Sequence, residues 1–243
     1  MREELSLQNL RSNLIRQEET IIFSMIERSQ FKQNINIYIK GFIQIPDFPG
    51  SFLDYFLAET EKVHSRVRRY TAPDEHPFTE NLPEPLITTS DYTWPIKKTE
   101  ININRKILQI YIDTIIPQIC RDGDDRNYGS SSLCDITALQ SISKRIHYGK
   151  FIAESKFQTQ SEEFTKLIKL KDEQGLMDLL TDATVEEQVL NRVKIKAAAY
   201  GNEPTAAVNE FKIEPDIIRS IYKSEIIPLT KEVEVLYLLQ RLD

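Results

Sequence analysis

The stretch KRIHYGKFIAESK, from Lys144 to Lys156, alternates cations with large apolar residues. Helical periodicity places Arg145, Gly149, Ile152 and Lys156 on one stripe, at steps of four, three and four residues. A stripe of this kind packs against neighbouring helices, and a buried cation requires an anion. The stretch therefore predicts a packed helix with two inward-facing cations, whose anion comes either from the protein or from a ligand.

The rest of the chain also has helical periodicity, and the sequence predicts an all-α fold. Glycine is scarce, and seven of the eleven prolines lie between Pro46 and Pro95, which predicts loops and short helices in that region. The sequence contains no alternating strand pattern, repeat or low-complexity segment. The predicted longer helices span residues 5–29, 50–71, 101–120, 132–158, 161–171, 173–180, 184–200, 214–225 and 227–242.

Several residues bear on the helix boundaries. Pro117 and Pro228 predict kinks or helix starts, because proline lacks the N–H that a helix interior uses. Thr184 is a predicted N-cap, with Glu187 three residues later completing a capping box. No shift in composition marks a domain boundary, so we expect one elongated, multi-helix domain over residues 1–243.

The composition limits the class of partner. The net charge is −6 and 28% of the residues are charged, which argues against nucleic acid or an anionic membrane as the main partner. The polar N-terminal segment MREELSLQN predicts no signal peptide, and no apolar run approaches the ~18 residues of a membrane span. Two cysteines make neither a disulfide framework nor a metal site, so we expect a cytoplasmic protein.

Charged residues interrupt other packing stripes as well. The first predicted helix carries a seam with steps of four and three residues, formed by Leu7, Arg11, Leu14, Glu18, Ile21 and Met25. Its length predicts packing along another helix, either within the chain or across a dimer. A later helix aligns two acids with two valines, as Asp182, Glu186, Val189 and Val193, while Thr230 and Glu234 lie one turn apart near the C-terminus.

The charged stripe residues have two interpretations. They form internal salt bridges or extend to the surface, which is common for single seam charges. Alternatively, several helices each direct one polar group inward and build a ligand site, as helix bundles do. The mixture of cations and carboxylates then suits a small dianion with an additional hydroxyl or ether. The residues concerned are Arg11, Glu18, Arg145, Lys156, Asp182, Glu186 and Glu234.

Other familiar kinds of site are absent from the sequence. His64, His76 and His147 lack metal-ligand spacing, and there is no Gly-rich phosphate loop or nucleophile motif. The segment DGDDRN from Asp122 departs from a calcium loop, because Asn127 occupies the position of the turn glycine. We interpret it as a solvated loop, and the sequence predicts no metal and no cofactor.

Five segments resemble the fungal and plant-type chorismate mutases: LQNLR (7–11), SFLDYFLAETEKVHSRVRRY (51–70), RDGDD (121–125), LQSISKRIHYGKFIAESKFQ (139–158) and IIPLTKEVEVLYLLQRL (226–242). The resemblance covers nearly the whole chain in order. It implies an all-helical homodimer with its active site in a helical bundle. It also implies the conversion of chorismate to prephenate, toward phenylalanine and tyrosine. That intramolecular [3,3] rearrangement needs no nucleophile, metal or redox cofactor.

The resemblance assigns a role to each catalytic position. It implies that Arg11 and Arg145 bind the two substrate carboxylates and that Lys156 reaches the ether oxygen. Glu186 matches the acceptor for the ring hydroxyl, while Thr230 and Glu234 match a pair at the far end of the site. Glu234 also faces the ether oxygen, so burial has to raise its pKa and keep it protonated.

One position departs from the family pattern. Asp182 stands where the fungal enzymes have an asparagine, whose amide donates to a substrate oxygen. An ionised aspartate has no proton to donate. Asp182 is therefore protonated, paired with Lys156, or turned away from the substrate, and the sequence leaves these alternatives open.

The resemblance also implies a regulatory site at the dimer interface, where tyrosine binds and inhibits the enzyme and tryptophan binds and activates it. Arg68 and Arg69 match an arginine pair, and Asn127, Gly129 and Ser130 match a loop, so an effector region is expected around residues 68–69 and 126–133. Two positions depart from the pattern, since Leu133 and Glu214 stand where relatives have threonine. Without the resemblance, RVRRY (66–70) would be interpreted as a solvated basic face.

Two rival functions follow from the same residues. One is a catalytically inactive helical scaffold or regulatory homologue that keeps the fold; retention of Arg11, Arg145 and Lys156 argues against it. The other is an enzyme that acts on a different small cyclic dicarboxylate. Loss of chorismate absorbance with purified protein separates all three hypotheses.

Overall fold

The computed structural model describes residues 5–88, 92–202 and 211–242. This part of the chain is helical and contains no strand beyond two isolated bridge pairs, which confirms the all-α prediction. The α-helices are α1 (Leu7–Ser29), α2 (Phe52–Arg66), α3 (Asn104–Ile110), α4 (Ile116–Ile119), α5 (Tyr128–His147), α6 (Gly149–Thr159), α7 (Ser161–Leu170), α8 (Glu173–Leu180), α9 (Ala183–Gly201), α10 (Pro215–Ile221) and α11 (Ile227–Leu239). Short 3₁₀ and π segments connect some of them, at Ile35–Ile37, Arg69–Thr71, Tyr111–Ile115 and Tyr222–Ile226.

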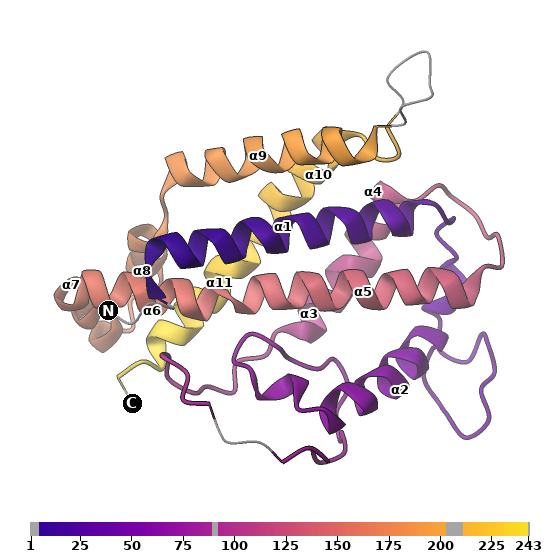
Figure 1. Cartoon of the computed structure of the whole chain (residues 1–243), viewed down its shortest axis with the longest axis horizontal. Coiled ribbons are helices and arrows are strands. Elements are labelled where there is room, and N and C mark those ends of the chain that lie inside the picture. The colour runs from indigo at the N-terminus through magenta and orange to yellow at the C-terminus, as the bar shows by residue number, and fades with distance from the viewer. Residues whose placement is uncertain (1–4, 89–91, 203–210, 243) are drawn as a thin grey trace.

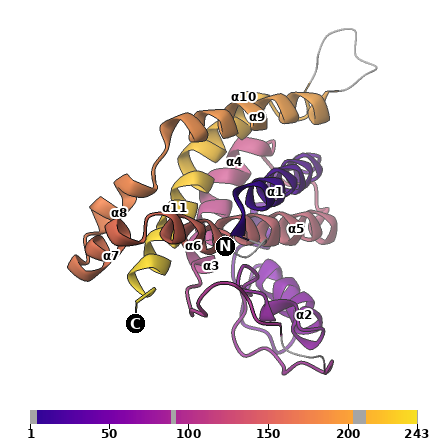
Figure 2. The ribbon, with the colours of Figure 1, turned by 60° about the vertical axis from the view of Figure 1, so that its left-hand side comes forward.

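The long helices lie in layers. Figure 1 shows α9, α1 and α5 stacked one below the other, with α2 on the far side of α5. The chain from α10 to α11 crosses behind this stack and reaches α5, α6 and α8 (Figure 2). Helices α1 and α5 run in opposite directions, since Arg28 contacts Asp135 and Asn13 contacts Tyr148.

The seam of the first helix packs within the chain. Ile21 and Met25 are fully buried in a core cluster that includes apolar residues from Leu5 to Leu238. Helix α1 contacts α5 and α9 along this seam. The side chain of Leu7 lies outside the described residues. The apolar seam therefore joins helices of one chain, which answers the question that the sequence left open.

The helix predicted over 132–158 differs from the structure in two respects. It begins earlier, at Tyr128, and is divided at Tyr148 into α5 and α6. The amide of Phe151 donates to the Tyr148 carbonyl at 3.0 Å, a tighter 3₁₀-type turn at the junction. Close packing of Gly149 on α11, described below, accompanies this break.

The two prolines mark helix starts, as predicted. Pro117 and Pro228 occupy the first turns of α4 and α11, and each follows a π segment. The change of hydrogen-bond pattern in the π segment accommodates a residue that has no N–H to donate. The N-cap prediction for Thr184 is wrong: the N-cap of α9 is Asp182, whose Oδ1 accepts from the amides of Thr184 and Val185, each at 3.0 Å. Both residue types cap well, so the sequence alone does not separate them.

No helix in the described residues combines the length and the apolar character that crossing a membrane requires.

Candidate active site

Arg145 is a buried cation without a counterion among the described residues. It is 5% exposed, and its Nη1 donates to the hydroxyl of Thr230 at 3.2 Å. Its Nε is buried and has no hydrogen-bond partner in the described part of the molecule. Burial lowers the pKa of this guanidinium, against the attraction of Tyr222, Glu18 and Glu234. The anion that the sequence called for is therefore not supplied by a direct ion pair.

Helix α11 presents Thr230 and Glu234 to this cation. Both residues are buried, and the Thr230 hydroxyl also donates to the Ile226 carbonyl at 2.7 Å. Gly149 at the start of α6 allows the approach: a Cβ there would lie 2.8 Å from the Thr230 carbonyl oxygen and 3.2 Å from Glu234 Cγ. The glycine on the charged stripe thus brings the catalytic candidates of α5, α6 and α11 together.

Lys156 lies at the other end of the same stripe. Its ammonium donates to the Leu180 carbonyl at 2.6 Å and lies 3.4 Å from Glu234 Oε2. Burial raises the pKa of Glu234, and the nearby Lys156 and Arg145 offset part of that rise. The result is a cation beside a carboxyl group whose pKa is raised, and when Glu234 holds its proton the two groups are donors that can face one oxygen atom.

Glu186 and Asp182 lie at the beginning of α9. Glu186 is half-buried and accepts from Lys231 at 3.0 Å, which fixes its carboxylate near α11. Asp182 is exposed and its carboxylate caps the helix, as described above. Lys156 lies beside Glu234 and does not pair with Asp182, whose carboxylate accepts from the α9 backbone.

Arg11 is the least constrained of the predicted site residues. It is exposed on α1 and makes no hydrogen bond or ion pair with the described residues. It lies two turns from Glu18 on the same face of α1. The structure thus brings Arg145, Lys156, Thr230 and Glu234 together, whereas Arg11 lies on the α1 face without contacting them.

The sequence interpretation missed the partner of Glu18. This fully buried carboxylate accepts two hydrogen bonds from Arg192 of α9, at 2.6 and 2.8 Å, and Lys196 lies 3.5 Å away. The charge of Glu18 also acts on Arg145. The sequence did contain a signal for this contact, because a single acid in an apolar seam requires a cation. It did not indicate which cation. Lys231, next to Thr230, was missed as well.

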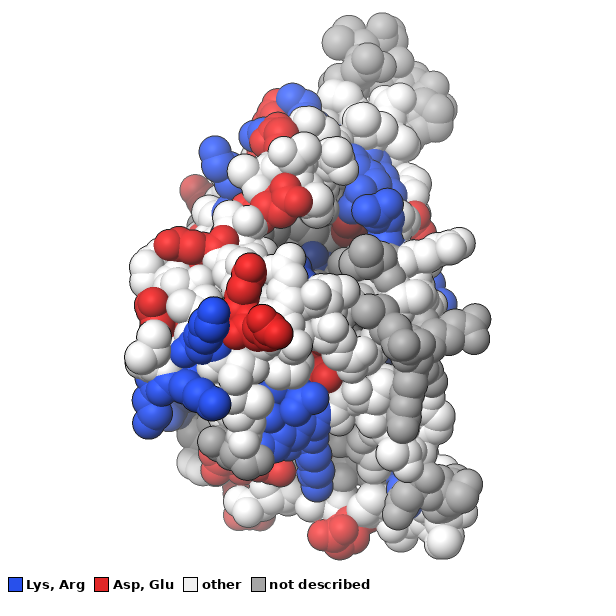
Figure 3. Space-filling view, turned by 90° about the vertical axis from the view of Figure 1, so that its left-hand side faces the viewer, with Lys and Arg blue, Asp and Glu red and all other residues white. Residues whose placement is uncertain are grey.

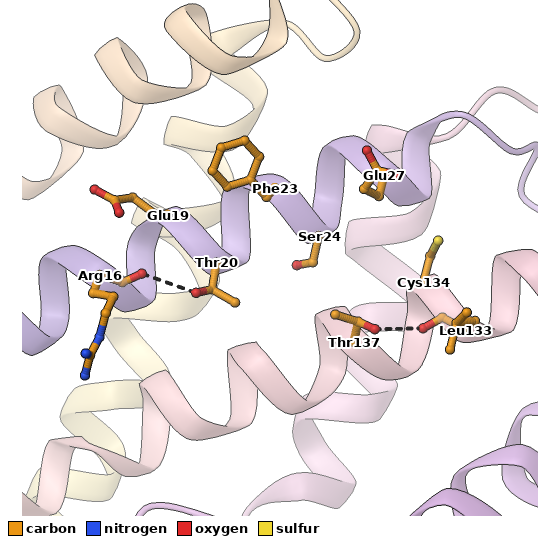
Figure 4. Close-up of a pocket in the computed structure, with 9 residues that line it drawn as sticks. All are labelled: Arg16, Glu19, Thr20, Phe23, Ser24, Glu27, Leu133, Cys134 and Thr137. Carbon is orange, nitrogen blue, oxygen red and sulfur yellow. Dashed lines mark hydrogen bonds between the residues drawn. The ribbon is translucent and has the colours of Figure 1, made fainter.

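The end of the molecule at which α6 to α8 lie carries mixed charges. Figure 3 shows acidic and basic side chains interspersed over this face, with basic atoms visible inside a recess. A cavity of about 540 Å³ lies elsewhere, between α1 and α5, and is lined by Arg16, Glu19, Thr20, Phe23, Ser24, Glu27, Leu133, Cys134 and Thr137 (Figure 4). The lining residues that belong to α1 are on the face of that helix opposite Glu18. This cavity is therefore separate from the candidate active site.

One chain does not bring the candidate effector residues together. Arg69 donates to Glu75 at 2.8 Å and to Gln140 in the middle of α5 at 2.7 Å. Arg68 lies beside it in the left-handed backbone conformation. Asn127, Gly129 and Ser130 are exposed at the start of α5. Gln140 and Gly129 are roughly 16 Å apart along the helix axis, at 1.5 Å per residue. Leu133 and Glu214 are both exposed.

The DGDDRN segment is a largely exposed loop, as predicted, with one aspartate that is anchored by hydrogen bonds. The Asp125 carboxylate accepts from the amides of Lys32 and Asn127 and from the side chain of Asn34, at 2.9 to 3.0 Å. These hydrogen bonds lower its pKa to about 2, although desolvation acts in the opposite direction. No group of three or more metal-binding side chains occurs in the residues described. The segment therefore connects the 32–36 turn to the start of α5.

Known proteins resemble the chain over its full length. A family model described as Chorismate mutase type II matches residues 127–235. The chorismate mutase of Schizosaccharomyces pombe is 47% identical, over 99% of this chain and 98% of that protein. The crystal structure of Aro7p chorismate mutase from Candida albicans in complex with L-Trp is 44% identical with a TM-score of 0.94, over 98% of this chain and 92% of that one. AtCM1 with tyrosine bound in its allosteric site is 43% identical with a TM-score of 0.91, over 100% and 98%. The sequence of this chain and its helical fold both match these proteins, and the chain belongs to the type II chorismate mutase family.

Proposed function

We propose that this chain is a chorismate mutase that converts chorismate to prephenate by electrostatic preorganisation, without a covalent intermediate. The observation that carries the proposal is the arrangement of Arg145, Lys156 and Glu234 where α5 and α6 meet α11. Lys156 lies beside Glu234, whose pKa is raised, and the buried guanidinium of Arg145, which has no counterion among the described residues, also acts on that carboxyl group. These groups suit a dianion whose C–O bond breaks with growing charge on the ether oxygen.

The proposed roles follow the geometry. Arg145 binds one substrate carboxylate, because its Nε is free and its Nη1 is already oriented by Thr230. Arg11, exposed on α1, binds the second carboxylate when substrate enters. Lys156 and protonated Glu234 donate to the ether oxygen, and Glu186 accepts from the ring hydroxyl in exchange for its contact with Lys231.

The energetic demand is within reach of these groups. An enzyme commonly lowers a barrier by at least about 8 kcal/mol. One preorganised donor contributes roughly 3–4 kcal/mol. Two donors on the ether oxygen, together with folding of the flexible substrate into a chair-like near-attack shape, therefore suffice.

The direct test is the loss of chorismate absorbance with purified protein. Turnover that is abolished in Arg145→Met and retained in Arg105→Met, an exposed arginine on α3, supports the assignment. A folded wild-type protein that leaves chorismate unchanged would favour the inactive-scaffold alternative. Turnover of another cyclic dicarboxylate instead would favour the second rival.

We also propose a homodimer regulated by tyrosine and tryptophan. The support is that Arg69 and the Asn127–Ser130 turn are too far apart along α5 to bind one amino acid within one chain, whereas two chains can each supply one half. Light scattering should give twice the 28.3 kDa chain mass, and calorimetry should detect binding of both amino acids. A 28.3 kDa species, or no heat with either amino acid, would contradict this part.

We infer that residues 1–243 form one catalytic domain with the effector region integrated into it, and that the protein is cytosolic. The core cluster that extends from Leu5 to Leu238 within the described residues supports the first point. The free thiols of Cys120 and Cys134 fit a reducing compartment and support the second. Fractionation of cells that express the tagged chain tests the location.

A further inference from the structure

Glu75 joins the candidate effector arginine to the helix that carries Arg145. One carboxylate oxygen accepts from Arg69 Nε at 2.8 Å, and the other accepts from Lys144 Nζ at 2.6 Å. Burial would raise the pKa of Glu75, but the hydrogen bond from Lys144 and the charge of Arg69 outweigh it and lower the pKa. Lys144 immediately precedes Arg145 on α5, and Asp74 lies 3.8 Å from the same ammonium. A single carboxylate thus bridges two cations that belong to two different elements.

The segment that carries Glu75, residues 72–79, which we call the strap, is also attached to α6. The ammonium of Lys150 is fully buried and donates to Pro73 O at 3.1 Å, to Ile101 O at 2.9 Å and to His76 Nε2 at 2.7 Å. All three acceptors are uncharged. Burial lowers the pKa of Lys150 to about 8, so this cation is held by the geometry of the strap and not by a paired carboxylate.

Asn104 of α3 connects the strap to the C-terminal part of α5. The Asn104 side-chain amide donates to the carbonyls of His76 and Pro77, at 2.8 and 3.0 Å, and its oxygen accepts from Ser143 at 2.5 Å. The strap is therefore fixed to α5 and α6 on both sides of their junction at Tyr148. Displacement of the strap has to move or release these contacts, because each one is short and at least partly buried.

The junction leads directly to the candidate active site. Lys150 follows Gly149, and Gly149 packs on Thr230 and Glu234 so closely that an added Cβ would meet them at 2.8 and 3.2 Å. The α5–α6 junction cannot move toward α11 at this point, because no free space separates Gly149 from α11. A shift of the junction therefore changes the position of α6, which carries Lys156, relative to α11.

We propose that Glu75, Lys144 and Lys150 are positioning residues that couple an amino-acid effector on Arg69 to the active site through the strap. The inference rests on the proposed effector role of Arg69. An effector carboxylate at Arg69 competes with Glu75 for the guanidinium. When Glu75 is displaced, the strap loses its link to Arg69, and the α5–α6 junction relaxes. Glu75 is thus an internal carboxylate that occupies the effector position in the resting chain.

The first test measures the effector response of Glu75→Gln and Lys144→Gln. The matched control is Glu59→Gln, which removes an exposed carboxylate paired with Lys62 on α2. With the bridge absent, tyrosine or tryptophan should bind Glu75→Gln roughly fivefold or more tightly. The ratio of kcat/KM with and without the amino acid should approach one, because the effector has no Glu75–Arg69 contact left to displace. An unchanged Kd together with an unchanged response would overturn the proposal.

The second test needs no effector. Amide hydrogen exchange of the free Glu75→Gln and Lys144→Gln proteins should rise both in the strap and at residues 147–152, whereas Glu59→Gln should change neither. An increase confined to the strap, or no increase at all, refutes the coupling. If wild-type protein binds neither amino acid, the effector assignment fails by itself, and the exchange comparison still decides whether the strap controls the junction.

Discussion

The ammonium of Lys156 lies 3.4 Å from Oε2 of Glu234, a residue that is only 4% exposed. Lys156 makes its shorter hydrogen bond, at 2.6 Å, to the Leu180 carbonyl, so its pairing with the carboxyl is incomplete. An ionised Glu234 would repel the negative charge that develops on a substrate ether oxygen. The pair therefore works as two donors only while Glu234 keeps its proton, and several outcomes follow from this.

The first concerns the dependence of rate on pH. Because burial raises the pKa of Glu234, the protonated, active form extends above the ordinary range of a carboxyl group and disappears as pH rises through the shifted value. We predict that kcat/KM of the wild type falls as pH rises through the raised pKa of Glu234 and that Glu234→Gln flattens this fall. The control is Glu232→Gln, which changes a half-buried carboxylate paired with Lys106. An unchanged pH profile in Glu234→Gln would refute the role of this residue.

The same substitution should change the pH dependence of stability. A carboxyl whose pKa is raised in the folded state contributes stability that is complete below the unfolded pKa of about 4.3 and is lost as pH rises through the folded value. Thermal unfolding should therefore show that Glu234→Gln gains stability relative to the wild type at pH 8, with little difference at pH 4. A constant difference in Tm across that range would show that Glu234 does not retain its proton.

Asp182 provides a test of the departure from the family pattern. Its Oδ1 accepts two backbone hydrogen bonds at the start of α9, and an asparagine side chain can accept the same bonds. We expect Asp182→Asn to keep or raise kcat/KM, while Asp182→Ala loses about 0.5–2 kcal/mol of unfolding free energy. A hundredfold loss of kcat/KM in Asp182→Asn would reveal a catalytic role that the capping geometry does not provide.

The close approach at Gly149 predicts a catalytic effect from one methyl group. Its Cβ would lie 2.8 Å from the Thr230 carbonyl oxygen, so Gly149→Ala has to separate α6 from α11. We expect kcat to fall roughly tenfold to a hundredfold, because catalytic groups tolerate little displacement. Gly201→Ala on α9 is the matched control, since its nearest contact would be 3.8 Å. Equal kcat values for the two variants would contradict the packing argument.

The sequence predicted the parts of this molecule that depend on periodicity. Arg145, Gly149 and Lys156 lie on one stripe as the spacing indicated, and in the structure this stripe meets α11. The sequence did not separate local signals of equal strength. Asp182 and Thr184 are both good N-cap residues, and in the structure Asp182 is the N-cap of α9. The break at Tyr148 also depends on packing, because Gly149 has to fit against α11.

Helical periodicity does not predict contacts between residues that are far apart in the sequence. Glu18 and Arg192 are 174 positions apart, and a seam acid does not specify which cation it will meet. Arg69 and the Asn127 turn were assigned together by resemblance, yet one chain holds them at different levels of α5. The bridge at Glu75 joins elements that only the folded structure brings together.

The most direct measurement of the central claim is kcat/KM for chorismate in Lys156→Met, compared with wild type and with Lys166→Met, an exposed lysine on the neighbouring helix α7. Removal of one preorganised donor should lower kcat/KM by about a hundredfold to a thousandfold, with folding unchanged, while Lys166→Met matches the wild type. A Lys156→Met enzyme that retains kcat/KM within a few fold of wild type would contradict the account.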